Sequence, residues 1–424
     1  MKSAIEVRIW GKQVGGVAFD PQANCYVFSY AKGWLKEGIE LSPLRMPTRV
    51  GRELFAFPEL SRLTYSGLPG MLSDALPDNW GNAVVDAYLL SKGIAKTSVT
   101  VLDRLSYMGK RGMGALEFKP TMGGRPKLST GIRMQSLVEE ARLVVQGFLT
   151  NQDLAKNALS EIIDVGSSAG GARAKAVVAW NETTGELRSG QFEVQEGFEH
   201  WLLKFDGMGK DPDLGGTEHY GRIEYAYHLM ARAAGIQMSD CRLLEENGRA
   251  HFMTRRFDRD ANQKHHVQTL CGMDHLDFRY GMTHSYGQAF VVLAKLGLGA
   301  DTRDELFRRM AFNVMARNCD DHTKNIAFIL KQGGEWALAP AYDVIFAHNP
   351  AGEWTAHHQM SINGRFDGIG REDLLLDAER FGVRRPAALL ADVRSAVASF
   401  GEHAREAGLP DSAKDEIARQ FQVV

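Results

Sequence analysis

The 424-residue sequence predicts an α+β fold, in which strand-rich regions are followed by a mostly helical one. Short segments of alternating apolar residues recur at 4–30, and apolar strand-like segments return at 176–205. Residues 372–420 are instead rich in alanine and arginine and have a helical pattern. These two observations favour separate sheet and helix regions along the chain.

We expect three parts along the chain. Residues 1–118 form an N-terminal α/β module, 119–260 form a lobe with a sheet, and 261–424 form a helical lobe. A Gly- and Pro-rich linker at 119–127 opens the second part. Strands are expected at 4–10, 14–19, 25–30, 176–180, 200–205, 326–330 and 336–338, and helices at 79–92, 99–108, 134–148, 223–234, 286–296 and 301–317.

Composition limits the classes of function. Hydrophobic residues make up 44% of the chain, enough for about two or three cores, and no apolar run reaches the length of a membrane helix. The first residues lack the apolar core of a signal peptide, so we expect a cytoplasmic protein that does not contact membranes. A net charge of −2 argues against direct nucleic-acid binding, and the arginine pairs at 308–309 and 384–385 are expected on solvated helix faces.

The strongest chemical signal is an acidic motif followed by a second aspartate. Asn325 follows Asp320 by five positions, and Asp343 comes after a short apolar segment with the pattern of a hairpin. Kinase-like phosphotransferases hold a general base and magnesium with this arrangement. Carboxylate and amide oxygens suit Mg²⁺, so Asn325 and Asp343 are candidate metal ligands. Asp320 is the candidate base that deprotonates the attacking hydroxyl.

Local structure explains how these residues would meet. A helix is expected to precede the motif, with Thr302 and Glu305 forming a capping box at its start. A glycine-containing turn at 331–335 would join two short strands into a hairpin. The returning strand would then bring Asp343 beside Asn325.

A lysine and a glutamate upstream fit the same chemistry. Lys204 stands inside the apolar segment 200–205, where a charge is costly without an anionic partner. In a kinase-like lobe this partner is nucleotide phosphate, and a carboxylate on a helix braces the amine. Glu224, in the expected helix 223–234, is the candidate brace.

The segment 165–175 is rich in glycine and small residues and precedes an apolar strand. A loop of this composition lets backbone N–H groups approach phosphate closely. It lacks the spacing of a Walker P-loop and is not a clean dinucleotide-binding fingerprint. Taken alone, a segment of this composition is more often an ordinary flexible loop.

Other interpretations remain open for individual residues. The triplet 320–322 could be a solvated acidic loop or part of a hydrolase metal site, and Lys204 could extend to solvent from an edge strand. Cys319, which precedes Asp320, has no evident histidine partner to make it a nucleophile. The four cysteines lack the CxxC spacing of zinc sites. The adjacent histidines at 265–266 and at 357–358 would diverge, so we expect them on the solvated surface.

These motifs together resemble the HipA family of serine/threonine kinases, the toxin components of type II toxin–antitoxin pairs. The most specific similarities lie at 170–175, 256–259, 320–325 and 340–344. The segments 67–70 and 74–81 are also similar to the N-terminal module of that family. The resemblance covers nearly the whole chain and implies a protein-kinase-like fold of the PI3/4-kinase type.

The resemblance implies an ATP- and Mg²⁺-dependent kinase with a role for each matching residue. Asp320 would be the catalytic base, and Asn325 and Asp343 would hold Mg²⁺. Lys204 would contact phosphate, with Glu224 bracing its amine.

The resemblance also implies self-regulation and further contacts to ATP. Ser168 matches the loop serine that members of the family phosphorylate on themselves to become inactive, and Ser167 is the adjacent alternative acceptor. Residues 255–257 are similar to the hinge strand that holds adenine, although Arg255 stands where an acidic residue is common. The expected ATP contacts are Ser168, Ala169, Gly170, Gly171, Ala172, Lys175, Lys204, Arg255, Phe257, Asp258 (to the sugar), His322 and Lys324.

Partners follow from the resemblance as well. A small helix-turn-helix antitoxin of the same operon would hold the kinase and connect it to operator DNA. The protein substrate would be a translation component such as an aminoacyl-tRNA synthetase. A small-molecule kinase and an inactive scaffold that only joins the antitoxin remain alternatives. The chain retains Asp320, Lys204, Asn325 and Asp343, which counts against the scaffold.

Overall fold

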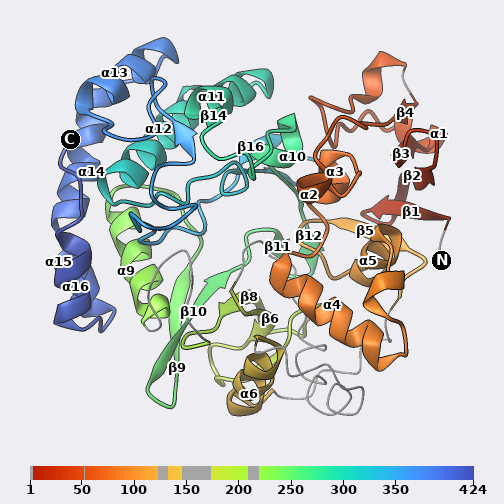
Figure 1. Ribbon diagram of the computed structural model, residues 1–424, viewed down its shortest axis with the longest axis horizontal. Coiled ribbons are helices and arrows are strands. Elements are labelled where there is room, and N and C mark those ends of the chain that lie inside the picture. The colour runs from red at the N-terminus through yellow and green to blue at the C-terminus, as the bar shows by residue number, and fades with distance from the viewer. Residues whose placement is uncertain (1–2, 52, 123–131, 146–172, 209–218) are drawn as a thin grey trace.

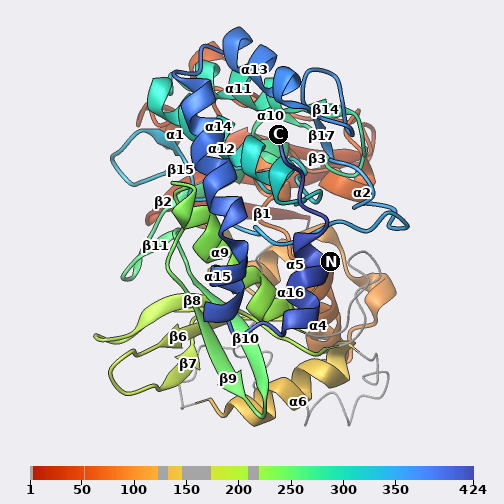
Figure 2. The same ribbon diagram turned by 90° about the vertical axis from the view of Figure 1, so that its left-hand side faces the viewer.

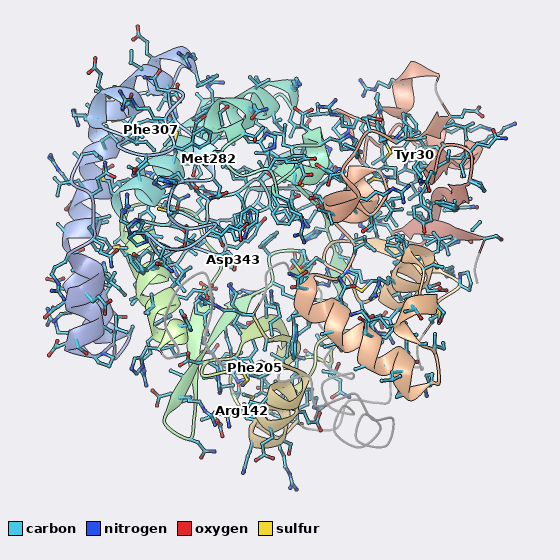
Figure 3. The ribbon with its side chains drawn as sticks, in the orientation of Figure 1. Tyr30, Arg142, Phe205, Met282, Phe307 and Asp343 are labelled. Carbon is cyan, nitrogen blue, oxygen red and sulfur yellow. The ribbon has the colours of Figure 1, made fainter. Side chains whose placement is uncertain are left out.

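The computed structural model describes residues 3–51, 53–122, 132–145, 173–208 and 219–424. Figure 1 shows the N-terminal module on the right, a lobe with a twisted sheet below, and a helical lobe at the upper left. Asp343 lies between the sheet lobe, marked by Phe205, and the helical lobe, marked by Phe307 (Figure 3). Among the described helices, none combines the length and apolar character needed to cross a membrane.

The N-terminal module is a five-stranded antiparallel sheet with helices packed on it. The sheet order is β4-β3-β2-β1-β5, and buried residues alternate along β1 as the period-two pattern of a strand requires. The strands and helices expected in this part are confirmed to within two residues. Its elements are β1 (Ala4–Ile9), β2 (Lys12–Asp20), β3 (Cys25–Tyr30), β4 (Leu54–Phe55), β5 (Leu116–Lys119), α1 (Lys32–Leu35), α2 (Arg62–Tyr65), α3 (Gly70–Ser73), α4 (Asn79–Ser91) and α5 (Val101–Met108).

The sheet lobe carries a second five-stranded antiparallel sheet, of order β7-β6-β8-β10-β9. One face of this sheet packs on α4 and α6, while the helix α9 packs on β9 and β10. The central strand β8 is buried on both faces, which explains its continuous apolar sequence. The elements are β6 (Lys175–Trp180), β7 (Leu187–Ser189), β8 (Glu199–Lys204), β9 (Cys241–Glu246), β10 (Arg249–Arg255), α6 (Met134–Val145) and α9 (Tyr220–Ala233).

The helical lobe contains the largest core, in which α12 packs on α14 and α9 packs on α15 (Figure 2). The predicted hairpin at 326–338 is confirmed, because β15 and β16 pair antiparallel. The elements are α10 (Leu270–Asp274), α11 (Tyr286–Lys295), α12 (Ala300–Met315), α13 (Arg371–Arg380), α14 (Pro386–Ala398), α15 (Phe400–Glu406), α16 (Asp411–Ala418), β11 (Arg259–Asp260), β12 (Gln263–Lys264), β13 (His266–Thr269), β14 (His284–Ser285), β15 (Ala327–Leu330), β16 (Trp336–Leu338) and β17 (Met360–Ser361).

The start of α12 differs from the prediction. The N-cap residue is Gly299, which has no side chain to accept a hydrogen bond, so the expected capping box of Thr302 and Glu305 is wrong. Glu305 instead accepts hydrogen bonds from Nε of Arg309 (2.8 Å) and from the backbone N–H of Gln237 (3.0 Å). Arg309 is therefore buried and also donates to the carbonyl of Ala339, which makes the predicted solvated position of this arginine wrong.

The histidine pairs were expected on the surface, and this is wrong for three of the four residues. His265, His266 and His358 are at most 3% exposed, whereas His357 is exposed. Neighbouring side chains do diverge, but His266 and His358 reach polar partners from distant segments. Nε2 of His266 donates to the carbonyl of Leu41 (3.0 Å), which gives this nitrogen of the buried ring a partner.

Burial of His266 gives a testable pH dependence. Burial lowers the pKa of this histidine from 6.5 to about 4, although the hydrogen bond to Leu41 acts in the opposite direction. Below pH 6.5 the histidine binds a proton in the unfolded chain, whereas in the folded chain it stays neutral down to about pH 4. The free energy of unfolding therefore decreases as the pH falls from 6.5 to 4. Between pH 7 and 4.5, we expect the free energy of unfolding of wild type to decrease by up to about 3 kcal/mol more than that of His266→Gln.

Urea unfolding of the two proteins at both pH values measures this difference. His357→Gln, at the exposed neighbouring position, is the matched control and should follow wild type at both pH values. An unchanged difference between wild type and His266→Gln would contradict a neutral buried imidazole.

The N-terminal module holds the short helix α10 of the helical lobe. Gly70 in α3 and Gly272 in α10 touch through their backbones, because a Cβ at Gly70 would lie 2.3 Å from the carbonyl oxygen of Gly272. The carboxylate of Asp74 accepts hydrogen bonds from the backbone N–H (2.8 Å) and hydroxyl (2.9 Å) of Thr269, the N-cap of α10. The two regions thus meet without space for an added side chain.

Candidate active site

The acidic motif forms a tight loop between α12 and β15. The backbone N–H of Cys319 donates to Ala347 (2.9 Å), which anchors the start of the loop. Nδ2 of Asn325 donates to the carbonyl of Asp320 (2.7 Å), and the backbone N–H of Asn325 donates to His322 (2.9 Å). These bonds close the loop, which we call the catalytic loop (residues 318–325).

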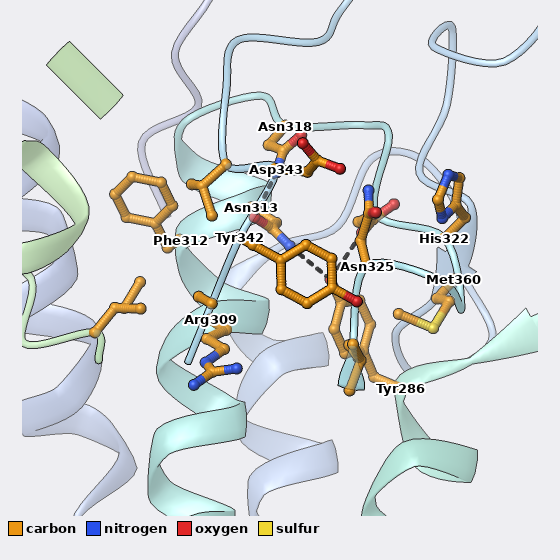
Figure 4. A pocket seen from close by; sticks show the side chains of 15 residues that line it. Tyr286, Arg309, Phe312, Asn313, Asn318, His322, Asn325, Tyr342, Asp343 and Met360 are labelled. Carbon is orange, nitrogen blue, oxygen red and sulfur yellow. Dashed lines mark hydrogen bonds between the residues drawn. The ribbon is translucent and has the colours of Figure 1, made fainter. Parts of the chain in front are cut away.

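The hairpin brings Asp343 to the same pocket as Asn325, as its sequence pattern predicts (Figure 4). Asp343 has a left-handed backbone conformation (φ 52°), which aspartate tolerates better than most residues. The other residues that line the pocket include Asn313, Asn318, Asp321, His322 and Tyr342. One carboxylate and one amide oxygen at a shared pocket match the few protein ligands that Mg²⁺ requires when phosphate and water supply the rest.

No group of three or more His, Cys, Asp or Glu side chains that could hold a metal occurs among the described residues. Asn325 and Asp343 would hold a metal together with oxygens of water and a bound substrate. The amide oxygen of Asn325 stays available for this, because its Nδ2 is the atom bonded to Asp320.

Lys204 connects the sheet lobe to Asp343. Its Nζ lies 2.5 Å from Oε1 of Glu224 and also contacts the carboxylate of Asp343. The Lys204 side chain is 12% exposed and that of Glu224 is 4% exposed, so the geometry of the expected brace is present. Burial would raise the pKa of Asp343, but the charges of Lys204 and Lys175 outweigh it and lower the pKa. Burial would likewise lower the pKa of Lys204, yet its two carboxylate partners raise it.

Asp320 lies near Asp343 and His322, although it is not among the residues that line the pocket. Its side chain is 43% exposed and lies 3.6 Å from Nε2 of His322. Desolvation by the surrounding protein raises the pKa of Asp320 to about 6, the negative charges of Asp343 and Asp321 add to this effect, and His322 opposes it. A carboxyl with this pKa is ionised at neutral pH and still close enough in pKa to accept a proton.

Lys175 follows the glycine-rich loop and is 2% exposed. Its Nζ lies 2.9 Å from Oδ2 of Asp78, the N-cap of α4, and its carbonyl accepts a hydrogen bond from Nε1 of Trp80 (2.7 Å). The N-terminal module therefore anchors the strand that leaves the loop. Ser167, Ser168, Ala169, Gly170, Gly171 and Ala172 lie outside the described residues, so the expectations for the loop and its serines stay predictions.

The expected hinge at 255–257 is occupied by internal contacts. The backbone N–H of Arg255 donates to Asp240 (2.8 Å), and its guanidinium lies 2.9 Å from Glu199. The ring of Phe257 stands 5.8 Å from that of Tyr342, beside Asp343. Arg255 therefore offers no free backbone N–H to an adenine in this conformation.

Asp258 holds parts of the protein together instead of facing a ligand. It is fully buried, and its carboxylate accepts hydrogen bonds from Arg256 (2.7 and 2.9 Å), from Arg259 and from the backbone N–H of Gly114 (2.7 Å). Burial would raise the pKa of Asp258, but the two arginines lower it. With both oxygens occupied, the expected contact of Asp258 to the sugar is not available in this conformation.

His322 and Lys324 flank the aromatic ring of Phe278. The ring of His322 lies 5.2 Å from that of Phe278, and Nζ of Lys324 stands 4.8 Å from its centroid. His322 lines the pocket and is therefore positioned to meet a ligand. Burial raises the pKa of the Asp74 carboxyl, and Lys324 lies close enough for its charge to oppose this rise. The contacts of both residues to ATP stay predictions.

Two features of the site escaped sequence reasoning. Val177, Leu202 and Met113 form a small apolar cluster on the same sheet face as Lys204, a position that the period-two pattern of β8 could have indicated. The second feature is a histidine beside Cys319, because Nε2 of His358 lies 3.9 Å from its Sγ. The expectation that Cys319 has no histidine partner is therefore wrong, but Cys319 is fully buried and closed to a substrate.

Comparison with known proteins places the chain in a family. The model of the HipA N-terminal domain matches residues 5–119, and that of the HipA-like C-terminal domain matches residues 167–419. Among solved structures, the chain is similar to HipA of the Shewanella oneidensis MR-1 toxin–antitoxin system, determined with HipB and operator DNA. The TM-score is 0.66 at 18% sequence identity, with 98% of this chain and 94% of that chain covered.

A more distant similarity involves the Helicobacter pylori proinflammatory kinase CtkA, with a TM-score of 0.35, 11% identity, and coverage of 60% of this chain and 90% of that chain. No curated protein gave a significant match. The two family models together account for most of the chain, and the α+β, protein-kinase-like fold agrees with them. The chain therefore belongs to the HipA family of kinase-like toxin–antitoxin proteins.

Proposed function

We propose that the protein is an ATP- and Mg²⁺-dependent serine/threonine protein kinase that acts as the toxin of a toxin–antitoxin pair. One observation carries the proposal. Lys204 from β8, Asn325 from the catalytic loop and Asp343 from beyond the hairpin meet at one site, and Asp320 lies close enough to Asp343 for their charges to interact. Charge on a transferred phosphoryl group is stabilised by this combination of one buried cation, two metal ligands and one base.

Each residue has one task in the proposed reaction. Asp320 accepts the proton of the attacking serine or threonine hydroxyl, which its raised pKa permits. Lys204, held by Glu224, positions the phosphates of ATP, and Asn325 and Asp343 hold Mg²⁺. The bound metal neutralises the negative charge that phosphate oxygens bring to the site.

The partner and the cellular setting are also proposed from the family. The HipA chain of Shewanella oneidensis was determined with HipB and operator DNA, which supports a helix-turn-helix antitoxin as the partner of this chain. We propose contact with operator DNA through that antitoxin, a cytoplasmic location, and a translation component such as an aminoacyl-tRNA synthetase as substrate. We also keep domain boundaries near residues 118 and 260 as proposals.

Self-phosphorylation gives the direct test of this function. Dephosphorylated wild-type protein incubated with ATP and Mg²⁺ is expected to gain one phosphate on Ser168, or on Ser167 if the acceptor is the neighbouring residue. Intact mass and peptide mapping detect the product. Ser168→Ala should prevent the modification while it leaves transfer to a separate protein substrate intact.

The remaining outcomes decide between the function classes. Phosphate on the loop in wild type but not in Asp320→Ala would support a self-regulating protein kinase. ATP binding without any phosphate gain would instead favour a small-molecule kinase. A wild-type protein that binds neither ATP nor Mg²⁺ would favour the inactive scaffold.

A further inference from the structure

A buried polar network connects Asp321 of the catalytic loop to other parts of the helical lobe. The carboxylate of Asp321, only 2% exposed, accepts three hydrogen bonds. Oδ1 accepts from the backbone N–H of Gln359 (2.7 Å), and Oδ2 accepts from Nδ1 of His358 (2.9 Å) and from the hydroxyl of Tyr286 (2.9 Å). Nδ2 of Asn313 in turn donates to that hydroxyl (2.9 Å), so every oxygen of the cluster is engaged.

The network joins four segments that are separate in the sequence. Asp321 belongs to the catalytic loop, His358 precedes β17, Tyr286 is the first residue of α11, and Asn313 is in α12. β17 also pairs in parallel with β14, which leads into α11. The carboxylate of Asp321 is therefore the point at which the catalytic loop is fastened to the rest of the helical lobe.

The central contact of the network is a charge pair. Burial would lower the pKa of His358, but Asp321 outweighs this effect and raises the pKa to about 10. The imidazole ring thus carries a positive charge at neutral pH, opposite a carboxylate that is itself buried. Removing only one member of such a pair leaves an uncompensated charge in the interior, which is strongly unfavourable.

Asp320, the proposed base, depends on this support. Its side chain is 43% exposed, so its direction follows from the backbone on either side of it. Cys319 on one side is held by Ala347, and Asp321 on the other side is held by the network. Displacement of a reacting group by about 1 Å can lower a rate by about 10²-fold.

We infer that Asp321 and His358 are positioning residues for phosphate transfer, which hold the backbone of Asp320 in the orientation that the reaction needs. This inference rests on the proposed kinase function. His358 does not line the pocket of Asn325 and Asp343, and both carboxylate oxygens of Asp321, which does line it, already accept hydrogen bonds within the network. Their effect should therefore appear in the rate of transfer and not in the affinity for ATP.

Four variants test the inference: Asp321→Asn, His358→Asn, the double variant, and His357→Asn as the control. His357 is the exposed neighbour of His358 and lies outside the network. Each single variant of the pair is expected to lower kcat about 10- to 100-fold, with the Kd for ATP within about threefold of wild type. The double variant should lose less than the product of the two single losses, because no charge is left unpaired. His357→Asn should match wild type.

Tyr286→Phe keeps the inference testable if Asp321→Asn does not fold. It removes one donor to Asp321 and leaves the charge pair in place, so we expect kcat to fall several-fold without a change in Kd. Wild-type kcat in both Asp321→Asn and Tyr286→Phe, or in Tyr286→Phe alone when Asp321→Asn is unfolded, would overturn the inference. The inference would also be overturned if the kcat loss of the double variant equalled the product of the two single losses. It would equally be overturned if the losses in kcat were accompanied by proportionate changes in the Kd for ATP and in melting temperature. An inactive wild-type protein would refute the proposed kinase function instead.

Discussion

Asp320→Asn is expected to lower the rate of phosphate transfer by about 10²- to 10⁴-fold. Asparagine has nearly the same size as aspartate, but its amide cannot accept the proton of the attacking hydroxyl. The wild-type carboxyl is suited to this task because desolvation by the surrounding protein and the nearby charges of Asp343 and Asp321 raise its pKa to about 6. Single-turnover transfer of radiolabelled phosphate, with ATP in excess, measures the chemical step directly.

The affinity of this variant for ATP separates loss of the base from general damage. Asp320 is not among the residues that line the pocket of Asn325 and Asp343, so we expect Asp320→Asn to bind Mg²⁺ and ATP about as tightly as wild type. Asp367→Asn, at a position where the side chain is 60% exposed, is the control for an aspartate outside the site. Full transfer activity in Asp320→Asn would remove Asp320 from the mechanism.

Asp343→Asn is expected to weaken Mg²⁺-dependent ATP binding at least about 10²-fold, since even indirect supporters of a metal ligand contribute 10- to 100-fold. Asp343 shares a pocket with Asn325 and contacts Lys204, so its carboxylate serves both the metal and the lysine. Calorimetric titration with ATP in the presence of Mg²⁺, and again with EDTA, measures the two affinities separately.

The metal-free titration is the internal control for Asp343→Asn. If Asp343 is a metal ligand, the variant should lose the gain in affinity that Mg²⁺ gives to wild type, while binding in EDTA changes much less. An equal benefit from Mg²⁺ in both proteins would exclude Asp343 as a ligand. An equal loss under both conditions would instead assign its effect to the contact with Lys204.

Features encoded by neighbouring residues could be predicted from the sequence. The hairpin at 326–338 follows from a short apolar strand, two glycines and a second strand, all within one segment. Lys204 stood out because a lone lysine in an apolar strand requires an anion, and the structure places two carboxylates beside it. The capping box failed because Gly299 began the helix earlier, and nothing in Thr302 or Glu305 excludes that choice.

Features that depend on distant partners could not be predicted. Buried His266 donates from Nε2 to the carbonyl of Leu41, which is 225 residues away in the sequence. The pair of Asp321 and His358 spans 37 residues, whereas the sequence pattern compared each histidine only with its neighbour. Asp258 resembled a ligand contact by its motif, but its two arginines and Gly114 bind it inside the protein. The role of each of these polar residues depends on its contacts with distant parts of the chain, which a local sequence pattern does not reveal.

The contact between α3 and α10 has a consequence for the folding of the protein during its synthesis on the ribosome. Gly70 donates its backbone N–H to His275, a residue 205 positions later in the chain. Regions of a nascent chain fold as units, starting from the N-terminus. The N-terminal module can complete its sheet once Lys119 has emerged, so its glycine surface is already formed when α10 is made. Asp343 emerges later still, so Lys204 cannot contact this carboxylate until then. An interrupted translation product that ends before Asp343 would thus lack one residue of the proposed active site.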